Sequence, residues 1–217
     1  MKLAYGPALS LALFIGALTT PLAAQTVDPV NYFMLQPGLW RIEEDRAPGQ
    51  PSNYRFATVV TQLGKFTLHN EFEWNGSSWV PDDVSVFEIT PAALLFHGYQ
   101  NPITQDFEVF NPPIRIPRAM QIGTAVVQNL TVITPQGSLK VAVTALVSAI
   151  GITKQVKAGT FTNCARFQFS FMADQYTDQS IEIRSPQSGT IWSLNSELDA
   201  TEPELSMGSV DITERVQ

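Results

Sequence analysis

The segment from Lys65 to Trp74 alternates apolar and polar side chains along its length. An extended strand points successive side chains to opposite faces, so this period of two fits a β-strand with one apolar and one polar face. Asn75 and Gly76 follow at once, and this pair tolerates the positive φ angles of a tight hairpin turn. The segment therefore predicts a half-buried strand that ends in a hairpin and turns its polar face, which includes His69, toward solvent.

Shorter runs of the same period recur along the chain and are joined by turn-rich stretches such as "APGQPS". They predict an all-β fold with little helix: a single curved antiparallel sheet, arranged as a meander, a half-barrel or an open barrel. Further strands are expected over residues 38–46, 53–62, 84–90, 93–99, 105–110, 125–134, 139–150, 154–156, 164–172, 180–184, 190–198 and 209–214.

Two segments allow more than one interpretation. Alanine recurs in Leu139–Ile150, as in a helix, but Val141, Val143 and Val147 favour a strand that is buried on both faces. The segment "NPPIRIPRAM", residues 111–120, carries three prolines, which cannot donate to an interior ladder. We expect it to be a crossing between strands or an edge of the sheet.

The N-terminus predicts export. Residues 1–24, "MKLAYGPALSLALFIGALTTPLAA", combine Lys2, a short apolar run and a small-residue end, as in a secretory signal peptide. The apolar run is too short and too interrupted for a transmembrane helix. We expect cleavage after Ala24, a single β-rich domain over residues 25–217 without a transmembrane segment, and a periplasmic or secreted location. Tyr32 and Phe33 suggest that the start of this domain docks on the sheet.

Charge and cysteine content exclude several classes of function. The chain has 20 acidic against 13 basic side chains, a formal net charge of −7, and therefore lacks the clustered cations that nucleic acids and anionic membranes require. Cys164 is the single cysteine, so no intramolecular disulfide can form. It is out of phase with Ala165, Phe167, Phe169 and Phe171, and we interpret it as a small buried hydrophobe. A reactive thiol beside Arg166 and an intermolecular disulfide are the alternatives.

The sequence contains no recognisable catalytic or metal-binding motif, and we expect no cofactor, no metal and no catalytic residue. His69 is expected to be solvated and His97 partly buried. Asp82 and Asp83 are expected in a solvated loop, as is the acidic stretch of residues 197–206.

Aromatic side chains are the remaining candidates for binding. A groove lined by Phe and Trp suits an apolar ligand, although core packing accounts for the same residues. The candidate ligand-binding residues are Trp40, Phe66, Phe72, Trp74, Phe167, Phe169 and Phe171.

Three stretches resemble an uncharacterised family of bacterial secreted proteins and lipoproteins. "NYFMLQPGLWRI" resembles its "Y-F-P-L-x-x-G-x-x-W" opening, "VKAGTFTNCARF" its "V-x-V-P-A-G-T-F-x-N-C" strand, and "PPIRIPRAMQIG" its mid-chain proline segment. Met34 replaces the proline of the opening, and "IRSPQSGTIW" is a reduced form of the "W-Y-A-P-G-V-G-x-V" ending. The resemblance implies one curved sheet like the half-barrel of lipoprotein carriers, with Gly159 in a turn or bulge, Phe161 as an anchor and no catalytic role for the cysteine.

Three functions remain open at this level. The first is a non-enzymatic envelope protein that shelters a lipid or another apolar molecule against the concave face of the sheet. The second is a structural or partner-binding periplasmic protein that pairs through sheet edges with another envelope protein. The third, which we favour least, is an exported hydrolase.

Overall fold

The computed structural model describes residues 25–217 except 49, 51, 53, 175 and 200–208. The expected signal peptide lies outside the described residues, as does most of the acidic stretch. Most of the described chain is strand. The elements follow in the order β1 (Thr26–Val27), the 3-10 helix η1 (Pro29–Tyr32), β2 (Trp40–Arg46), β3 (Tyr54–Leu63), β4 (Phe66–Trp74), β5 (Trp79–Ile89), β6 (Ala93–Gln100), β7 (Phe107–Pro117), β8 (Met120–Gln121), β9 (Ala125–Thr134), β10 (Gly137–Val156), β11 (Gly159–Met172), β12 (Tyr176–Ser185), β13 (Gly189–Asp199) and β14 (Ser209–Arg215).

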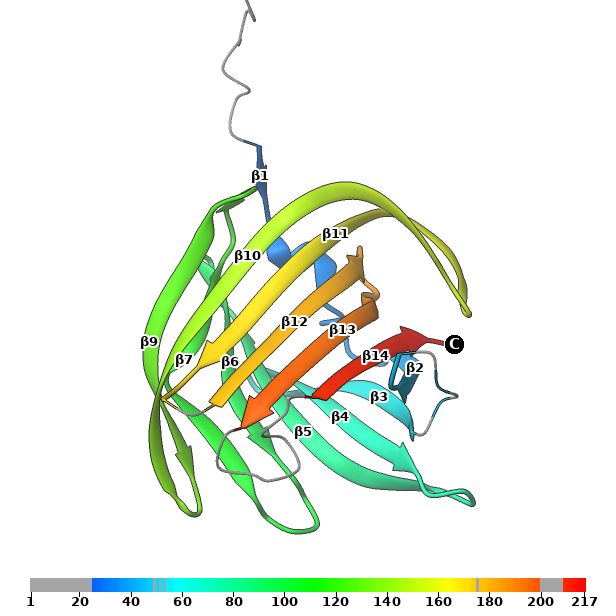
Figure 1. Ribbon diagram of the computed structural model, residues 1–217, viewed down its shortest axis with the longest axis horizontal. Coiled ribbons are helices and arrows are strands. Elements are labelled where there is room, and N and C mark those ends of the chain that lie inside the picture. The colour runs from blue at the N-terminus through cyan, green and yellow to red at the C-terminus, as the bar shows by residue number, and fades with distance from the viewer. Residues whose placement is uncertain (1–24, 49, 51, 53, 175, 200–208) are drawn as a thin grey trace, which may run out of the picture.

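The main sheet is a closed barrel, so the expectation of an open or half-closed sheet was wrong on this point (Figure 1). The strands follow one another as an antiparallel meander from β2 to β7, and β9 to β14 continue it. Closure comes from β14, whose Ile212 and Thr213 pair with Arg46 and Asp45 of β2. β1 and β8 form a separate two-stranded sheet.

The proline-rich segment is a barrel strand rather than a crossing or an edge. Its residues form most of β7, which pairs with β6 on both sides of an irregular stretch. On the β9 side the ladder covers only Val109 to Asn111 and stops where Pro112 and Pro113 begin. Beyond it, the Gln128 side chain accepts from the Arg115 N–H at 2.8 Å and donates to the Arg115 carbonyl at 2.7 Å. One side-chain amide thus replaces backbone pairing that the prolines interrupt.

The β4 strand and its hairpin form as expected, but its polar face points into the barrel. Thr67 and His69 are 3% and 6% exposed. Trp74, which belongs to the apolar row of the alternation, is 37% exposed. The prediction of a solvated His69 was therefore wrong. A closed barrel encloses one face of every strand, and here polar groups bind one another inside it. The turn is also longer than expected: Trp74 pairs with Trp79, and Oδ1 of Asn75 accepts from the Ser77 and Ser78 N–H groups.

Residues 25–39 close one end of the barrel. Phe33, Met34 and Leu35 are buried there, and Phe33 meets Phe87 and Phe167 edge-on. This agrees with the expected docking of the N-terminal aromatic residues. Figure 1 shows η1 at the end of the barrel next to β10 and β11. We call residues 25–39 the N-terminal plug.

The β10–β11 hairpin extends beyond the barrel and bends over toward the C-terminal strand (Figure 1). The whole of residues 137–156 is one strand, which rules out the helical alternative and joins the two strands expected there. At its tip, the Lys157 ammonium lies 2.6 Å from Oε2 of Glu44, and the Ala158 N–H donates to the Arg215 carbonyl.

Cys164 belongs to β11 of this hairpin and is fully buried against Ile183 and Ile191. Burial raises the pKa of its thiol, which disfavours the reactive thiolate. The interpretation of Cys164 as a small buried hydrophobe is confirmed. Phe161 packs against the same cluster.

Candidate functional site

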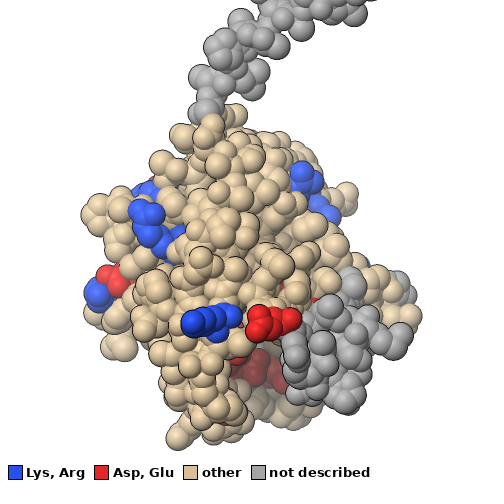
Figure 2. Space-filling view, turned by 60° about the vertical axis from the view of Figure 1, so that its left-hand side comes forward, with Lys and Arg blue, Asp and Glu red and all other residues tan. Residues whose placement is uncertain are grey.

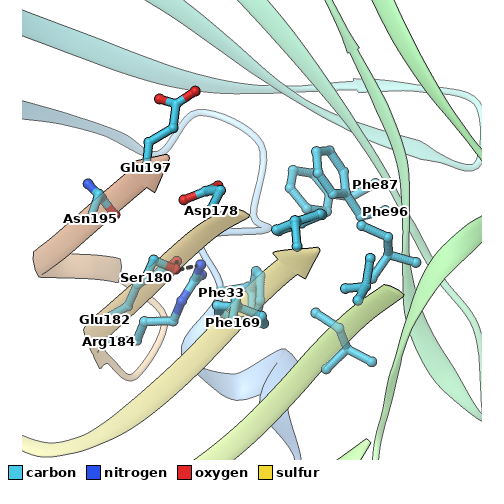
Figure 3. Close-up of a pocket in the computed structure, with 14 residues that line it drawn as sticks. Phe33, Phe87, Phe96, Phe169, Asp178, Ser180, Glu182, Arg184, Asn195 and Glu197 are labelled. Carbon is cyan, nitrogen blue, oxygen red and sulfur yellow. Dashed lines mark hydrogen bonds and ion pairs between the residues drawn. The ribbon is translucent and has the colours of Figure 1, made fainter. Parts of the chain in front are cut away.

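The barrel encloses a cavity of about 410 Å³ with walls of two different characters. Alternation along each strand brings one row of side chains into the lumen, so the character of each wall follows from the inward row of each strand. Figure 3 shows the polar side chains of β12 and β13 gathered together, with Phe87 and Phe96 opposite them. The apolar wall, from the plug and β5, β6, β7, β10 and β11, consists of Phe33, Phe87, Phe96, Ile114, Ile116, Val143, Phe169 and Phe171, and the polar wall of Asp178, Ser180, Glu182, Arg184, Asn195 and Glu197.

Two further regions of the lumen adjoin this apolar cavity. A polar cavity of about 230 Å³ shares Phe33, Phe87, Glu182 and Arg184 with it. A third cavity, of about 430 Å³, shares Phe171, Asp178 and Glu197 with it. Along β12 the lumen therefore runs from Arg184, which touches the plug, to Asp178, which lies farther from it.

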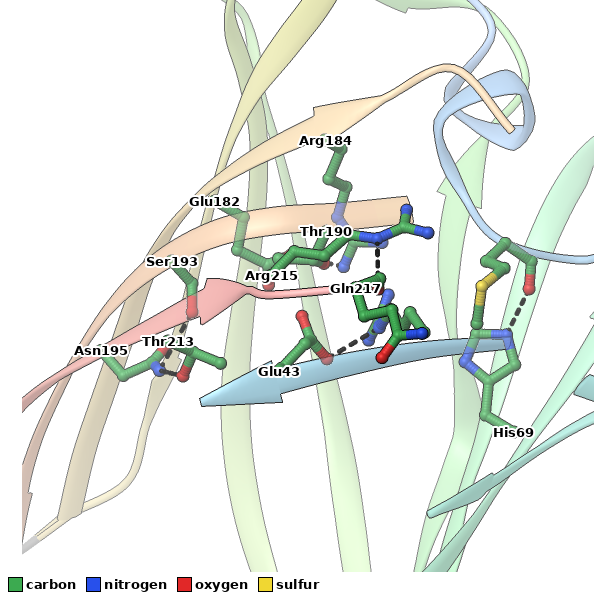
Figure 4. Close-up of polar contacts among 12 residues, drawn as sticks. Glu43, His69, Glu182, Arg184, Thr190, Ser193, Asn195, Thr213, Arg215 and Gln217 are labelled. Carbon is green, nitrogen blue, oxygen red and sulfur yellow. Dashed lines mark hydrogen bonds and ion pairs between the residues drawn. The ribbon is translucent and has the colours of Figure 1, made fainter. Parts of the chain in front are cut away.

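The polar cavity is held together by two ion pairs (Figure 4). Nε of Arg41 donates to Oε2 of Glu43 at 2.7 Å, and Nη2 of Arg184 lies 2.5 Å from Oε2 of Glu182. Thr190 also donates to Glu182, at 3.0 Å. These charges are kept inside the barrel because each carboxylate has a cationic partner at contact distance.

Arg184 links the polar cavity to the N-terminal plug. Its guanidinium carbon lies 3.9 Å from the centre of the Phe33 ring, in cation–π contact. Its side chain is 12% exposed, and burial lowers its pKa. Arg184 is thus placed between the plug, the apolar wall and Glu182.

His69 fixes the plug from the opposite wall. Its Nε2 lies 2.6 Å from the Met34 carbonyl, and its ring centre lies 4.7 Å from that of Phe87. Because a carbonyl oxygen only accepts, Nε2 carries the proton. Burial, and next the positive charge of Arg41, lower the pKa of His69 to about 3, so the imidazole is neutral at ordinary pH.

Glu71 lies two residues further along β4 and also lines the polar cavity. Burial raises its pKa to about 7, with further contributions from Glu43 and Asp83, although Arg41 acts in the opposite direction. Near neutral pH a large fraction of this carboxyl group is therefore protonated.

The charged side chains that line the cavity far from the plug are all acidic, namely Glu108, Asp178 and Glu197. Burial, and next the charge of Glu197, raise the pKa of Asp178 to about 6. Burial and the carboxylates of Asp82 and Glu108 raise the pKa of Asp83. Figure 2 shows acidic side chains inside a hollow of the surface. Asp82 and Asp83 belong to β5 and not to a loop, which corrects the sequence-based expectation.

The structure divides the aromatic candidates for ligand binding among three environments. Phe169 and Phe171 line the apolar cavity. Phe167 is fully buried against Tyr32 and Phe33. The other four candidates lie on the faces of β2 and β4 opposite to the buried Arg41, Thr67 and His69. They are Trp40, Phe66, Phe72 and Trp74, and Trp40 is 50% exposed.

The cavity also contains residues that the sequence did not single out. Phe87 and Phe96 pair across β5 and β6 with ring centres 4.8 Å apart. The sequence places both residues inside predicted strands, but the alternation of side chains did not indicate which face of each strand would point into the barrel. Arg184 and Glu182 were missed because polar residues on a strand are expected to face solvent.

The described part of the chain has neither a metal-binding cluster nor a membrane-spanning helix. It contains no group of three or more His, Cys, Asp or Glu side chains arranged to hold a metal ion. Nor does that part of the chain include a helix with the length and hydropathy needed to cross a membrane.

Comparison with known proteins finds a solved structure with a similar fold. No protein-family model matches the sequence, and no curated protein is significantly similar to it. A protein from Bacteroides fragilis NCTC 9343, described as exported and as having a YmcC-like fold, has a solved structure that superposes with a TM-score of 0.55 at 8% sequence identity. The superposition covers 86% of this chain and 97% of the other. The chain shares that fold.

A protein described as a lipoprotein, from Parabacteroides distasonis ATCC 8503, superposes with a TM-score of 0.47 at 10% identity, over 89% of this chain and 99% of its own. The description of the B. fragilis protein agrees with the periplasmic or secreted location expected for this chain. At this identity the likeness concerns the fold, and the three sequence stretches of the resemblance remain a prediction.

Proposed function

We propose that this protein is an exported, non-enzymatic binding protein that holds one lipid chain or other apolar molecule inside its barrel. The observation that carries the proposal is the aromatic cavity of about 410 Å³ in the lumen. Its volume lies within the range of small-molecule sites, about 300–1,000 Å³. Of the sequence candidates, Phe169 and Phe171 would contact the ligand, together with Phe87 and Phe96.

The barrel offers less support for pairing through sheet edges. Each barrel strand described here has a hydrogen-bonded neighbour on both sides, and closure of this kind removes free edges. The apolar interior is instead available to a small ligand.

Filling the cavity tests the proposal. Ser180→Trp would place an indole in the lumen, whereas Gln179→Trp, one residue earlier on β12, adds the same side chain on the exposed face. We expect native mass spectrometry of protein purified gently from its host to find an added mass in the lipid range on the unaltered protein and on Gln179→Trp, but not on Ser180→Trp. Equal occupancy of all three would place the ligand outside the barrel, and absence from all three would contradict a tightly held ligand.

A second candidate, an exported hydrolase, rests on Asp178. A carboxyl group with its pKa raised to about 6 beside a second carboxylate, Glu197, matches a general acid paired with a base or nucleophile. Turnover of chromogenic glycosides or esters that disappears in Asp178→Asn would favour this candidate over the binding protein.

A further inference from the structure

The polar cavity beside Arg184 has no role in a purely apolar site. It shares Arg184, Glu182, Phe33 and Phe87 with the apolar cavity, so the two spaces adjoin at these side chains. Its remaining lining is mostly polar, namely Arg41, Glu43, His69, Glu71, Ser85, Thr190, Ser193 and Thr213. Burying this many polar groups is costly unless they bind one another or a ligand.

Ion pairs neutralise the arginine side chains that line this cavity. Arg41 and Arg184 are matched by Glu43 and Glu182, respectively. Arg215, the cross-strand neighbour of Glu43, lies outside the lining and donates from Nε to the Gln217 carbonyl at 2.9 Å. His69 is neutral, and Glu71 is largely protonated below about pH 7 because of its burial. Below about pH 7 the charged side chains that line the cavity therefore cancel, so a net negative charge does not oppose the entry of an anionic group.

Arg184 has hydrogen-bonding capacity to spare. Nη2 is used by Glu182, but Nε is buried without a hydrogen-bond partner among the described residues, as is Nη1 of Arg215. An unsatisfied buried donor costs about 1–3 kcal/mol, and more on a charged group, so such atoms in native structures call for a partner. A carboxylate, with two oxygens in one plane, is the acceptor that a guanidinium binds best.

We propose that the polar cavity is an anion subsite, in which Arg184 binds the carboxylate or similar anionic head group of an amphiphile. The apolar part of the ligand lies along Phe87, Phe96, Phe169 and Phe171. Asp178 and Glu197 lie at the other end of the polar wall, so repulsion from them also favours the anionic head group near the plug. This inference rests on the proposed function and adds the class of ligand to it.

A ligand series tests the subsite on the unaltered protein. Isothermal titration calorimetry with dodecanoate, dodecanol and dodecylamine, each below its micelle concentration, compares one chain with three head groups on delipidated full-length mature protein. We expect dodecanoate to bind at least about tenfold more tightly than either other compound, equivalent to about 1.4 kcal/mol. Equal binding of acid and alcohol would overturn the subsite but leave the carrier function in place. Preference for the amine would overturn the subsite in favour of the acidic end. Failure of all three to bind would overturn the carrier function and the subsite together.

Two substitutions with opposite expected effects complete the test. Glu182→Gln removes the internal competitor for Arg184 and should tighten dodecanoate binding about tenfold without changing dodecanol binding. Arg184→Met should reduce dodecanoate binding to the level of dodecanol, while Arg166→Met, on the exposed face of β11, should leave it unchanged. If Arg184→Met fails to fold by circular dichroism, Glu182→Gln decides: unchanged or weaker dodecanoate binding in that variant overturns the proposal.

Discussion

Replacing Phe167 by alanine should be among the most destabilising single changes in the barrel. The side chain is fully buried, and its ring centre lies 5.9 Å from that of Tyr32, 6.1 Å from that of Phe33 and 6.1 Å from that of Phe169. Truncation of a fully buried phenylalanine costs about 3–5 kcal/mol. The three ring contacts, each worth about 0.5–1.5 kcal/mol beyond burial, put this site in the upper part of that range. For a domain of this size the loss corresponds to a fall in Tm of roughly 8–16 °C.

Phe169→Ala is the matched comparison, because the same ring on the same strand faces an existing cavity. It enlarges a space that is already present, and we expect a loss of about 1–2 kcal/mol. Met172→Ala, 52% exposed on the other face of β11, should change stability by less than about 0.5 kcal/mol. Urea unfolding followed by tryptophan fluorescence would measure all three, provided the m-values agree. If Phe169→Ala costs as much as Phe167→Ala, the lumen beside Phe169 is filled and the reasoning fails.

Three further predictions concern the backbone, pH and the cysteine. Gly98→Ala should cost at least about 2 kcal/mol, because φ is +137° and a Cβ would lie 1.9 Å from the Glu108 carbonyl oxygen. A Tm equal to that of the parent protein would contradict this close approach of the two strands. The raised pKa of Glu71 means that the folded state binds an extra proton, so its contribution to stability is present at acidic pH and lost as pH rises through about 7. Glu71→Gln should flatten this fall between about pH 4.5 and about pH 7, and an unchanged slope would refute the shift. The lowered pKa of His69 acts in the opposite direction, because it removes stability as pH falls below the usual pKa of histidine toward about 3. Cys164→Ser should lower the free energy of unfolding by about 1–3 kcal/mol through burial of a hydroxyl, without loss of ligand binding; calorimetry that finds no change in Tm would exclude tight packing at this site.

The strands were predictable because local pattern determines them. Alternation over Lys65–Trp74 and β-branched residues in Leu139–Ile150 predicted extended segments that the structure contains. Closure was not predictable in this way. It depends on pairing between β2 and β14, far apart in sequence, and no local pattern encodes that partnership. The prolines of β7 led to the wrong prediction of a crossing or an edge for a related reason. Gln128 of β9 supplies hydrogen bonds to this strand that the sequence of β7 itself cannot reveal.

The candidate site was only partly predictable because the orientation of a strand is a property of the whole fold. Phe169 was expected to contact a ligand and lines the cavity. His69 was expected in solvent, yet the plug covers it and its proton binds Met34. Glu182 and Arg184 resemble solvated strand residues in the sequence, and only the enclosure of the lumen makes them a buried pair.

The pairing of β2 with β14 also governs when the chain can fold. Arg46 and Glu214, joined across this seam, are separated by 168 positions, so the loop between them must be ordered before their contact can form. A chain that emerges N-terminus first, from a ribosome or across a membrane, keeps β2 without one of its neighbours until the last strand arrives. Until then β2 presents an open edge that invites aggregation. This topology therefore makes completion of the chain the step after which the barrel can close.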